Sequence, residues 1–121
     1  MTNKNKWDVI VIGGGLAGLT TALHLAVNNF SVCLVEKNKY PNHKVCGEYV
    51  SNEVLPYLKS LGIDPISVGA KQISKFEITD TMGNPIKTTL PLGGFGISRY
   101  TFDNLLFEAL KNKTDIFFET V

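Results

Sequence analysis

Hydrophobic residues fall into two continuous runs in the first third of the chain, and each run has the length of a buried strand. Residues 9–12 are all aliphatic, and residues 32–35 form a second apolar run that ends at the acidic Glu36. A continuous apolar run is typical of a parallel strand that is covered on both faces. Between the runs, residues 16–27 are rich in helix-compatible apolar residues, and two asparagines follow them. The pattern predicts a strand, a helix and a second parallel strand.

After the second run the chain becomes polar, and a short helix is predicted to follow. Residues 37–49 contain many turn-forming residues, which predicts a loop. Residues 51–61 place four apolar side chains on one helical face. Pro56 lies within this segment and indicates a late start or an irregular first turn.

The second half of the chain predicts a hairpin and a second long helix. Residues 72–79 and 86–90 have strand character, and the six residues between them have good turn chemistry. The three glycines within residues 93–96 predict a loop or a strained strand edge. From Thr101 onward, apolar residues recur at the spacing of an amphipathic helix. Thr101 is expected to cap this helix, and Asp103 is expected to favour its first turn.

Residues 115–121 have the character of a further strand, at which the sequence stops. A parallel strand at the end of a chain has nothing after it to cover it. We therefore expect the sequence to be a fragment of a longer protein.

The turn between the first strand and the helix has the pattern Gly-x-Gly-x-x-Gly, formed by Gly13, Gly15 and Gly18. Gly13 permits the tight turn, Gly15 has no Cβ to keep a pyrophosphate from the backbone, and Gly18 lets the helix lie close to the strand. The free N–H groups at the positive end of the helix then face the phosphates. Glu36 follows at close to the expected offset of about 20 residues, where an acid accepts hydrogen bonds from ribose hydroxyls. The element therefore predicts a site for a dinucleotide.

A carboxylate at the position of Glu36 would repel a 2′-phosphate, so this element favours FAD or NAD over NADP. The alternative is a βαβ unit that binds nothing, in which Glu36 is a solvated strand end.

Composition and charge narrow the class of protein. The chain has 121 residues, about one small domain, and its net charge of +1 comes without a basic block, so no nucleic acid is expected as a partner. Its apolar runs are far shorter than the ~20 residues that span a bilayer, so no transmembrane segment is expected. Two cysteines fit a reducing compartment, and a cytoplasmic location is expected. The histidines and cysteines lack zinc-like spacing, so no metal is expected.

Three motifs occur together and in order along the chain. The first is the glycine turn within residues 8–18 followed by Glu36, and the second is the sequence KVCGE at residues 44–48. The third is the sequence GISRYTFDNLL at residues 96–106. Together they resemble the glutathione-reductase-like FAD-dependent oxidoreductases, specifically the branch of the geranylgeranyl reductases and the aromatic-hydroxylase-type flavin monooxygenases. The resemblance spans essentially the whole chain, which corresponds to the N-terminal portion of that family's usual chain.

This resemblance implies an α/β fold of the Rossmann-like FAD/NAD(P)-binding type, with a βαβ dinucleotide-binding unit in a parallel sheet and an inserted β-hairpin. Residues 1–121 would form the N-terminal part of an FAD-binding domain, an incomplete portion that is inactive alone. The implied cofactor is FAD. The implied activity is reduction of a prenyl-type double bond or flavin-dependent monooxygenation, with electrons from NAD(P)H or another donor. The implied substrate is a small molecule such as a prenyl lipid or an aromatic compound.

Two alternatives stay open at this point. The first motif also allows an NAD-binding dehydrogenase domain, although the second and third motifs have no reason to be present in one. The chain could also be a non-catalytic nucleotide-binding fragment.

The resemblance also implies roles for individual residues. The glycines would contact the pyrophosphate, and Glu36 would contact the adenosine ribose. Cys46 would lie beside the cofactor, and Arg99 would reach the cofactor from the far side. Alternatives are an ordinary loop thiol for Cys46 and a surface arginine for Arg99. Lys44 and Glu48 are expected to be solvated charges, and no catalytic residue is implied. The implied cofactor-binding residues are Gly13, Gly15, Leu16, Ala17, Gly18, Glu36, Lys37, Cys46, Gly47 and Arg99.

Overall fold

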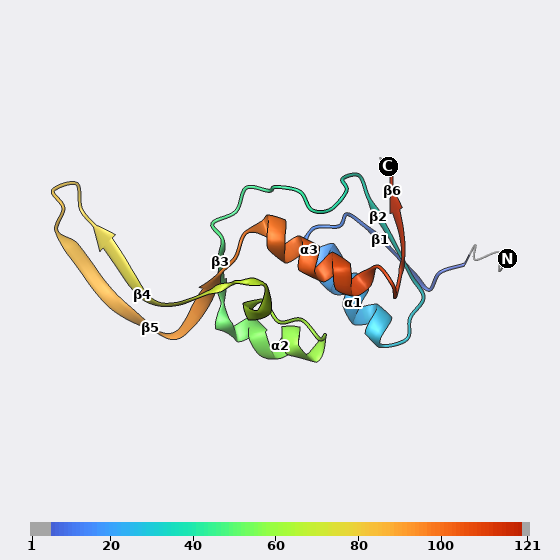
Figure 1. Ribbon diagram of the computed structural model, residues 1–121, viewed down its shortest axis with the longest axis horizontal. Coiled ribbons are helices and arrows are strands. Elements are labelled where there is room, and N and C mark those ends of the chain that lie inside the picture. The colour runs from blue at the N-terminus through green and yellow to red at the C-terminus, as the bar shows by residue number, and fades with distance from the viewer. Residues whose placement is uncertain (1–5, 120–121) are drawn as a thin grey trace.

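A parallel three-stranded sheet forms one end of the molecule in the computed structural model, which describes residues 6–119 (Figure 1). Its strands are β1 (Val9–Ile12), β2 (Val32–Glu36) and β6 (Asp115–Phe118), in the order β1-β2-β6. Helix α1 (Leu16–Val27) connects β1 to β2. The predicted strand-helix-strand unit is therefore confirmed. The last predicted strand is confirmed through Phe118, and residues 120 and 121 lie outside the described residues.

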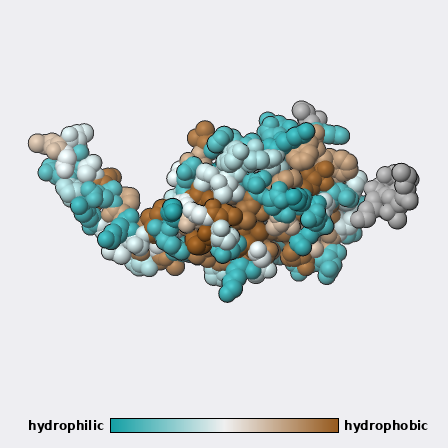
Figure 2. All heavy atoms as spheres, in the orientation of Figure 1, coloured by the Kyte–Doolittle hydropathy of each residue, from teal (hydrophilic) through white to brown (hydrophobic). Residues whose placement is uncertain are grey.

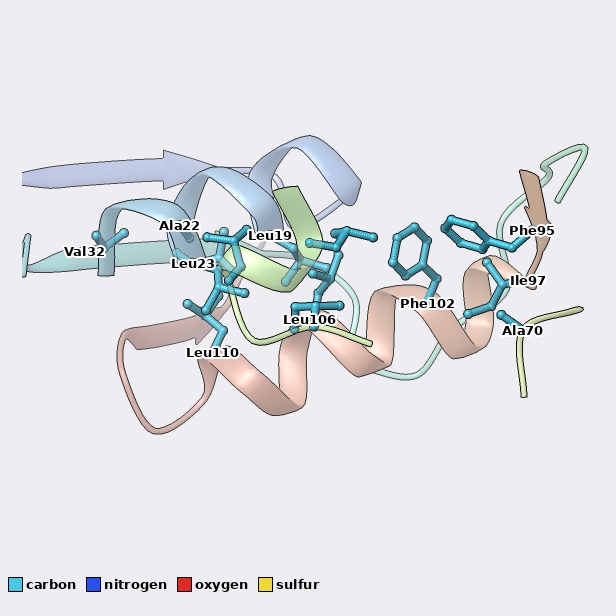
Figure 3. Close-up of a cluster of buried hydrophobic side chains, with 14 residues drawn as sticks. Leu19, Ala22, Leu23, Val32, Ala70, Phe95, Ile97, Phe102, Leu106 and Leu110 are labelled. Atoms are coloured by element: carbon cyan, nitrogen blue, oxygen red, sulfur yellow. The ribbon is translucent and has the colours of Figure 1, made fainter. Parts of the chain in front are cut away.

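The second long helix, α3 (Arg99–Leu110), packs against α1 and leads into β6 (Figure 1). Figure 3 shows the contact: leucines of α1 face leucines of α3, and the row of buried side chains continues to the aromatic rings of Phe95 and Phe102. These two rings meet edge to face, with centroids 6.1 Å apart. The apolar stripe predicted for the helix is therefore the side that forms the core.

The parallel sheet is covered on one face in the described part of the chain. Leu34 of β2 is fully buried, whereas Ile10 and Ile12 of β1 are 58% and 68% exposed. The expectation that the apolar run of β1 is covered on both faces is thus wrong for residues 6–119. The reason is that successive side chains of a strand point to opposite faces, and both long helices lie on the same face.

The segment after the long loop is less regular than the predicted helix. It contains the short strand β3 (Tyr49–Ser51), a 3₁₀ turn (Asn52–Val54) and helix α2 (Leu55–Ser60), and a second 3₁₀ turn (Ile66–Val68) follows. Pro56 lies in the first turn of α2, where its missing N–H costs no helical hydrogen bond. The irregular start that Pro56 predicts is confirmed, but the strand β3 was not predicted.

A long two-stranded hairpin extends from the body as an arm (Figure 1). Its strands are β4 (Lys71–Thr79) and β5 (Pro85–Gly96), and the base of β5 also pairs with β3. Figure 2 shows that apolar atoms gather on the body in this view, while the outer arm is mostly hydrophilic or neutral. No helix among residues 6–119 is long and apolar enough to cross a membrane.

Residues 93–96 belong to β5, so the expected loop or strand edge is wrong. Gly94 pairs with Ser51 on one side and with Ile73 on the other, so this part of β5 is central. A Cβ on Gly94 would lie only 2.4 Å from the ring of Tyr49. The glycine is required by the close approach of β3, and the sequence signal of a turn was therefore misleading.

Helix α3 begins two residues earlier than predicted. Ser98 is its N-cap, and the Ser98 hydroxyl accepts a hydrogen bond from the backbone N–H of Thr101 at 3.1 Å. Thr101 is therefore the residue that donates to the cap, and the expectation that it caps the helix is wrong. Asp103 consequently lies beyond the first turn, contrary to its expected role there.

Candidate functional site

The glycine turn lies at the carboxyl end of β1, where ligands bind in open α/β sheets. Gly13 has a φ of +96°, which favours glycine, and its N–H continues the pairing of β1 with β2 by donating to Val35 at 2.8 Å. Helix α1 starts at Leu16, and its N-cap, Gly15, contributes no side-chain hydrogen bond. The first N–H groups of α1 therefore carry no cap from a side chain, as an anion site at a helix start requires.

Gly18 holds the helix close to the strand. A Cβ at this position would lie 1.8 Å from the carbonyl oxygen of Gly13 and 3.5 Å from a methyl group of Val11. Such an overlap with backbone atoms cannot be relieved by rotating a side chain. Gly18 is therefore needed for the shape of the turn itself.

The peptide group of Gly14 is held from both sides. Its N–H donates to the carboxylate of Glu36 at 2.5 Å, and its carbonyl oxygen accepts from the phenol of Tyr40 at 2.6 Å. The second carboxylate oxygen of Glu36 accepts from the N–H of Asn38 at 2.8 Å. Glu36 is only 6% exposed, so the alternative of a solvated strand end is wrong. Each of its oxygens still has a lone pair with which to accept a further hydrogen bond.

Tyr40 was not expected at the site. Burial raises the pKa of its phenol, and the negative charges of Glu36 and Asp103 raise it further, so the phenol stays protonated as a donor. Its ring stacks on Phe107 of α3 with centroids 4.6 Å apart. Tyr40 thus connects the glycine turn to the second helix.

Two cations converge on Gly15. A Cβ built on Gly15 would lie 3.8 Å from Nη2 of Arg99 and 3.9 Å from Nζ of Lys44. The side chain of Lys44 is 27% exposed and that of Arg99 is 17% exposed. The expectation that Lys44 is a solvated charge is therefore wrong, and so is the alternative of a surface location for Arg99. The bare backbone at the start of α1 faces two positive charges.

A buried carboxylate anchors both cations. Asp103 is fully buried, and its two oxygens accept from Nε and Nη2 of Arg99 at 2.7 and 3.0 Å. Nζ of Lys44 lies 3.3 Å from Oδ2 of the same carboxylate. The hydrogen bonding of the Arg99 guanidinium to the carboxylate of Asp103 is the main reason that the pKa of Arg99 is raised. The spacing of Arg99 and Asp103 by four residues on a helix was the signal in the sequence for this ion pair.

The remaining implied residues surround this cluster less closely. The Cys46 thiol is exposed, lies beside the guanidinium of Arg99, and accepts from the N–H of Glu48 at 3.3 Å. Gly47 is exposed with open space at its Cα, and Lys37 is exposed immediately after β2. The implied residues of the first turn of α1 are Leu16 and Ala17.

Cys33 is the second cysteine, and it lies inside β2 rather than at the site. Burial is the main reason that the pKa of its thiol is raised, and the charge of Asp115 adds to it. Cys33 is therefore a small buried side chain, on the face of β2 opposite to Leu34.

A cavity of about 460 Å³ lies at the opposite end of the sheet, between the end of α1 and the start of β6. Polar and charged residues of the segment 111–115 form one of its sides. This cavity is at the amino ends of the strands, away from the glycine turn, so it is not part of the site.

Comparison with known proteins agrees with this geometry. A family described as FAD dependent oxidoreductase matches residues 8–47, which contain the glycine turn and Glu36. Over this segment the chain is similar to the FAD-dependent oxidoreductases. The resemblance inferred from the three motifs is therefore confirmed, and so is the expectation of FAD at the level of the family.

Two of the similar proteins are digeranylgeranylglycerophospholipid reductases. Digeranylgeranylglycerophospholipid reductase 2 of Methanothermobacter thermautotrophicus is 34% identical over 84% of this chain and 26% of its own length. The digeranylgeranylglycerophospholipid reductase of Methanoculleus marisnigri is 30% identical over 97% of this chain and 30% of its own length. This chain thus spans between a quarter and a third of the length of these relatives.

Among solved structures, 2-methyl-3-hydroxypyridine-5-carboxylic acid oxygenase superposes with a TM-score of 0.79 at 28% identity, covering 90% of this chain and 30% of the other. The p-nitrophenol 4-monooxygenase of Pseudomonas putida superposes equally well, with a TM-score of 0.79 at 21% identity, over 90% of this chain and 31% of the other. The predicted Rossmann-like fold with an inserted hairpin is confirmed.

Proposed function

We propose that this chain binds FAD and is the cofactor-binding portion of a flavin-dependent oxidoreductase. The observation that carries the proposal is Gly15: its backbone lies open at an uncapped helix start, and two cations lie within 4 Å of the space in front of it. An anionic group is the ligand that such a surface attracts. The match of residues 8–47 to the FAD dependent oxidoreductase family supports a dinucleotide as the source of that anion.

The residues of the site fit the two parts of an adenosine diphosphate. The N–H groups at the start of α1, together with Arg99, would hold the diphosphate, and the free lone pairs of Glu36 would accept hydrogen bonds from ribose hydroxyls. When bound, the flavin supplies the electron-transfer chemistry of such enzymes. The chain's own residues would bind and orient the cofactor.

For the reaction, we propose reduction of a prenyl-type carbon–carbon double bond in a lipid, with NAD(P)H or another electron donor. The names of the similar proteins from Methanothermobacter thermautotrophicus and Methanoculleus marisnigri support this reaction. A flavin monooxygenase acting on an aromatic compound is the second candidate, and the superposition on the 2-methyl-3-hydroxypyridine-5-carboxylic acid oxygenase favours it. We also propose a cytoplasmic location, for which two cysteines without a disulfide offer support.

The proposal is tested by titrating the 121-residue chain with FAD and, separately, with NAD, and following flavin fluorescence or heat release. We expect saturable binding of FAD that free ADP competes away, and weaker binding of NAD. Binding of NAD in preference to FAD would support the dehydrogenase alternative. Absence of binding to FAD, ADP and NAD in a folded sample would contradict the proposal.

A further inference from the structure

The long loop after β2 lies along helix α3 (Figure 1). Three of its side chains contact one side of the helix, at positions 100, 103 and 107, which are neighbours on successive turns. The contacts are the stacked rings of Tyr40 and Phe107 at 4.6 Å, the stacked rings of His43 and Tyr100 at 4.5 Å, and the ion pair of Lys44 and Asp103 at 3.3 Å. The loop is therefore held against α3 from Tyr40 to Lys44, and Lys44 itself forms the last of the three contacts.

Asp103 is the central member of these contacts. A fully buried carboxylate is costly to charge unless cations or hydrogen-bond donors surround it. Here Arg99 donates twice and Lys44 approaches the second oxygen. Because the backbone of α3 fixes Asp103, its carboxylate also fixes where the two cationic heads lie.

The two cations have a combined charge of +2, and Asp103 balances only one of these charges. The cluster consequently presents a net positive charge toward Gly15. A Cβ built on Gly15 would lie within 4 Å of both cationic heads. Gly15 is at the start of a twelve-residue helix, so the helix dipole adds to the same positive potential. The ligand that matches this arrangement is a diphosphate rather than a neutral sugar or base.

We propose that Lys44 is a second phosphate-binding cation beside Arg99, and that Asp103 is the positioning residue that holds both cations on the diphosphate of the bound dinucleotide. This proposal rests on the proposed function, because the diphosphate is that of the cofactor. It gives Lys44 and Asp103 a role that the sequence motifs had not assigned to them.

The role of Lys44 is tested with Lys44→Met and two ligands, ADP and adenosine, measured by calorimetry. We expect Lys44→Met to weaken ADP binding about tenfold, the effect of losing one charged hydrogen bond, and to change adenosine binding by less than about twofold. Lys44→Arg keeps the charge and should restore ADP binding to within about threefold. The matched control is Lys87→Met, since Lys87 also forms a 3.3 Å ion pair, with Glu77, but on the exposed hairpin.

The outcomes separate this proposal from the proposed function. If the wild-type chain does not bind ADP more tightly than adenosine, the diphosphate site itself is wrong. If the wild type does so and Lys44→Met keeps the same preference, the proposed function stands and the role of Lys44 is wrong.

The positioning role of Asp103 is tested with Asp103→Asn, alone and combined with Lys44→Met. We expect Asp103→Asn to weaken ADP binding about tenfold, and the added Lys44→Met to cost less than about threefold more, because Lys44 is already released. If the two substitutions each weaken ADP binding about tenfold and the double variant loses about a hundredfold, Asp103 does not act by positioning Lys44. If circular dichroism shows that Asp103→Asn does not fold, Asp103→Glu replaces it in the same comparison. Glutamate keeps the negative charge but moves it away from the position of the Asp103 carboxylate.

Discussion

At the scale of the residue, the glycine turn combines two requirements that look alike in the sequence. Gly18 is required by the fold, because a Cβ there would overlap the backbone of Gly13. Gly15 meets no such obstacle: the atoms nearest to its missing Cβ are the cationic heads of Arg99 and Lys44, more than 3.5 Å away. One glycine thus shapes the turn, and the other leaves space for a ligand.

Substitution of these two glycines should therefore separate stability from binding. We expect Gly15→Val to lose FAD binding while its melting temperature stays near that of the wild type, because its φ of −76° suits any residue and the added atoms fill the ligand's space. We expect Gly18→Ala to melt at a markedly lower temperature. Thermal denaturation and FAD titration of both variants measure this, and normal FAD affinity in Gly15→Val would contradict the assignment of the site.

Tyr40 offers a test that depends on pH. Tyr40→Phe removes the donor to the carbonyl of Gly14 and should cost about 0.5–1.5 kcal/mol of stability at pH 8. Because the pKa of Tyr40 is raised in the folded protein, the unfolded chain ionises first as the pH rises above about 10. The stability that Tyr40 contributes is therefore complete below that pH and is lost progressively above it.

Urea unfolding of the wild type and of Tyr40→Phe at pH 8 and pH 11 measures the difference. We expect the advantage of the wild type to shrink at pH 11. Tyr57→Phe, at an exposed tyrosine, is the control for the loss of one phenol. An advantage that stays constant or grows at pH 11 would show that the buried phenol does not resist ionisation.

At the scale of the element, helix α3 does two things at once. One side of it, with Phe102, Leu106 and Leu110, is buried in the core against α1 (Figure 3). Its first two turns carry Arg99 and Asp103, which form the cation cluster at the glycine turn. The start of α3 is therefore important for the position of the site as well as for stability.

The N-cap of α3 can be tested directly. We expect Ser98→Ala to destabilise the protein by about 1 kcal/mol, the usual cost of losing a capping side chain, because the N–H of Thr101 loses its acceptor. Thr101→Ala should cost less, since the Thr101 side chain caps no helical N–H in the structure. Chemical denaturation of the two variants measures this. A larger loss in Thr101→Ala than in Ser98→Ala would return the cap to the position that the sequence pattern predicted.

At the scale of the whole molecule, the parallel sheet has one buried face and one open face in the described residues. On the open side, Trp7 packs edge to face against Phe117 with centroids 5.9 Å apart, and its indole donates to Asp115 at 2.8 Å. The buried side joins the sheet, the two long helices and the base of the hairpin into one core. Most of the stabilising apolar contacts are thus expected to come from one side of β1 and β2.

This asymmetry predicts unequal costs for two similar substitutions. Leu34→Ala, at a fully buried position of β2, should destabilise the chain by about 2–5 kcal/mol. Ile12→Ala, at a position 68% exposed, should change stability by about 0.5 kcal/mol or less. Thermal or urea unfolding of this chain measures both variants. Equal losses would mean that the face carrying Ile12 is covered in solution, for example by self-association.

The strand-helix-strand unit, the glycine turn, Glu36 and the resemblance to the family could all be predicted from the sequence. Each depends on local spacing: continuous apolar runs, glycines at fixed intervals, and an acid at the end of a strand. The segment predicted as one helix over residues 51–61 contains the end of β3, a 3₁₀ turn and the short helix α2. Pro56 signalled the irregular start of the helix, but nothing in the local pattern signalled the strand. The glycines of residues 93–96 wrongly predicted a loop or a strand edge. They are small because β3 approaches this part of β5 closely, and the local sequence pattern does not show which strands will be neighbours.

The contact of Lys44 with Asp103 became visible only in the folded chain. Lys44 and Asp103 are 59 residues apart in the sequence, and nothing in the polar loop distinguishes Lys44 from the exposed lysines around it. Packing of the loop along α3 brings the two together, and the cost of burying a lone carboxylate explains why Asp103 gathers both cations. Tyr40 joins the site in the same way, through the stacking of its ring on a helix formed much later in the chain. Long-range contacts of this kind leave no periodicity in the sequence, so only the folded chain reveals them.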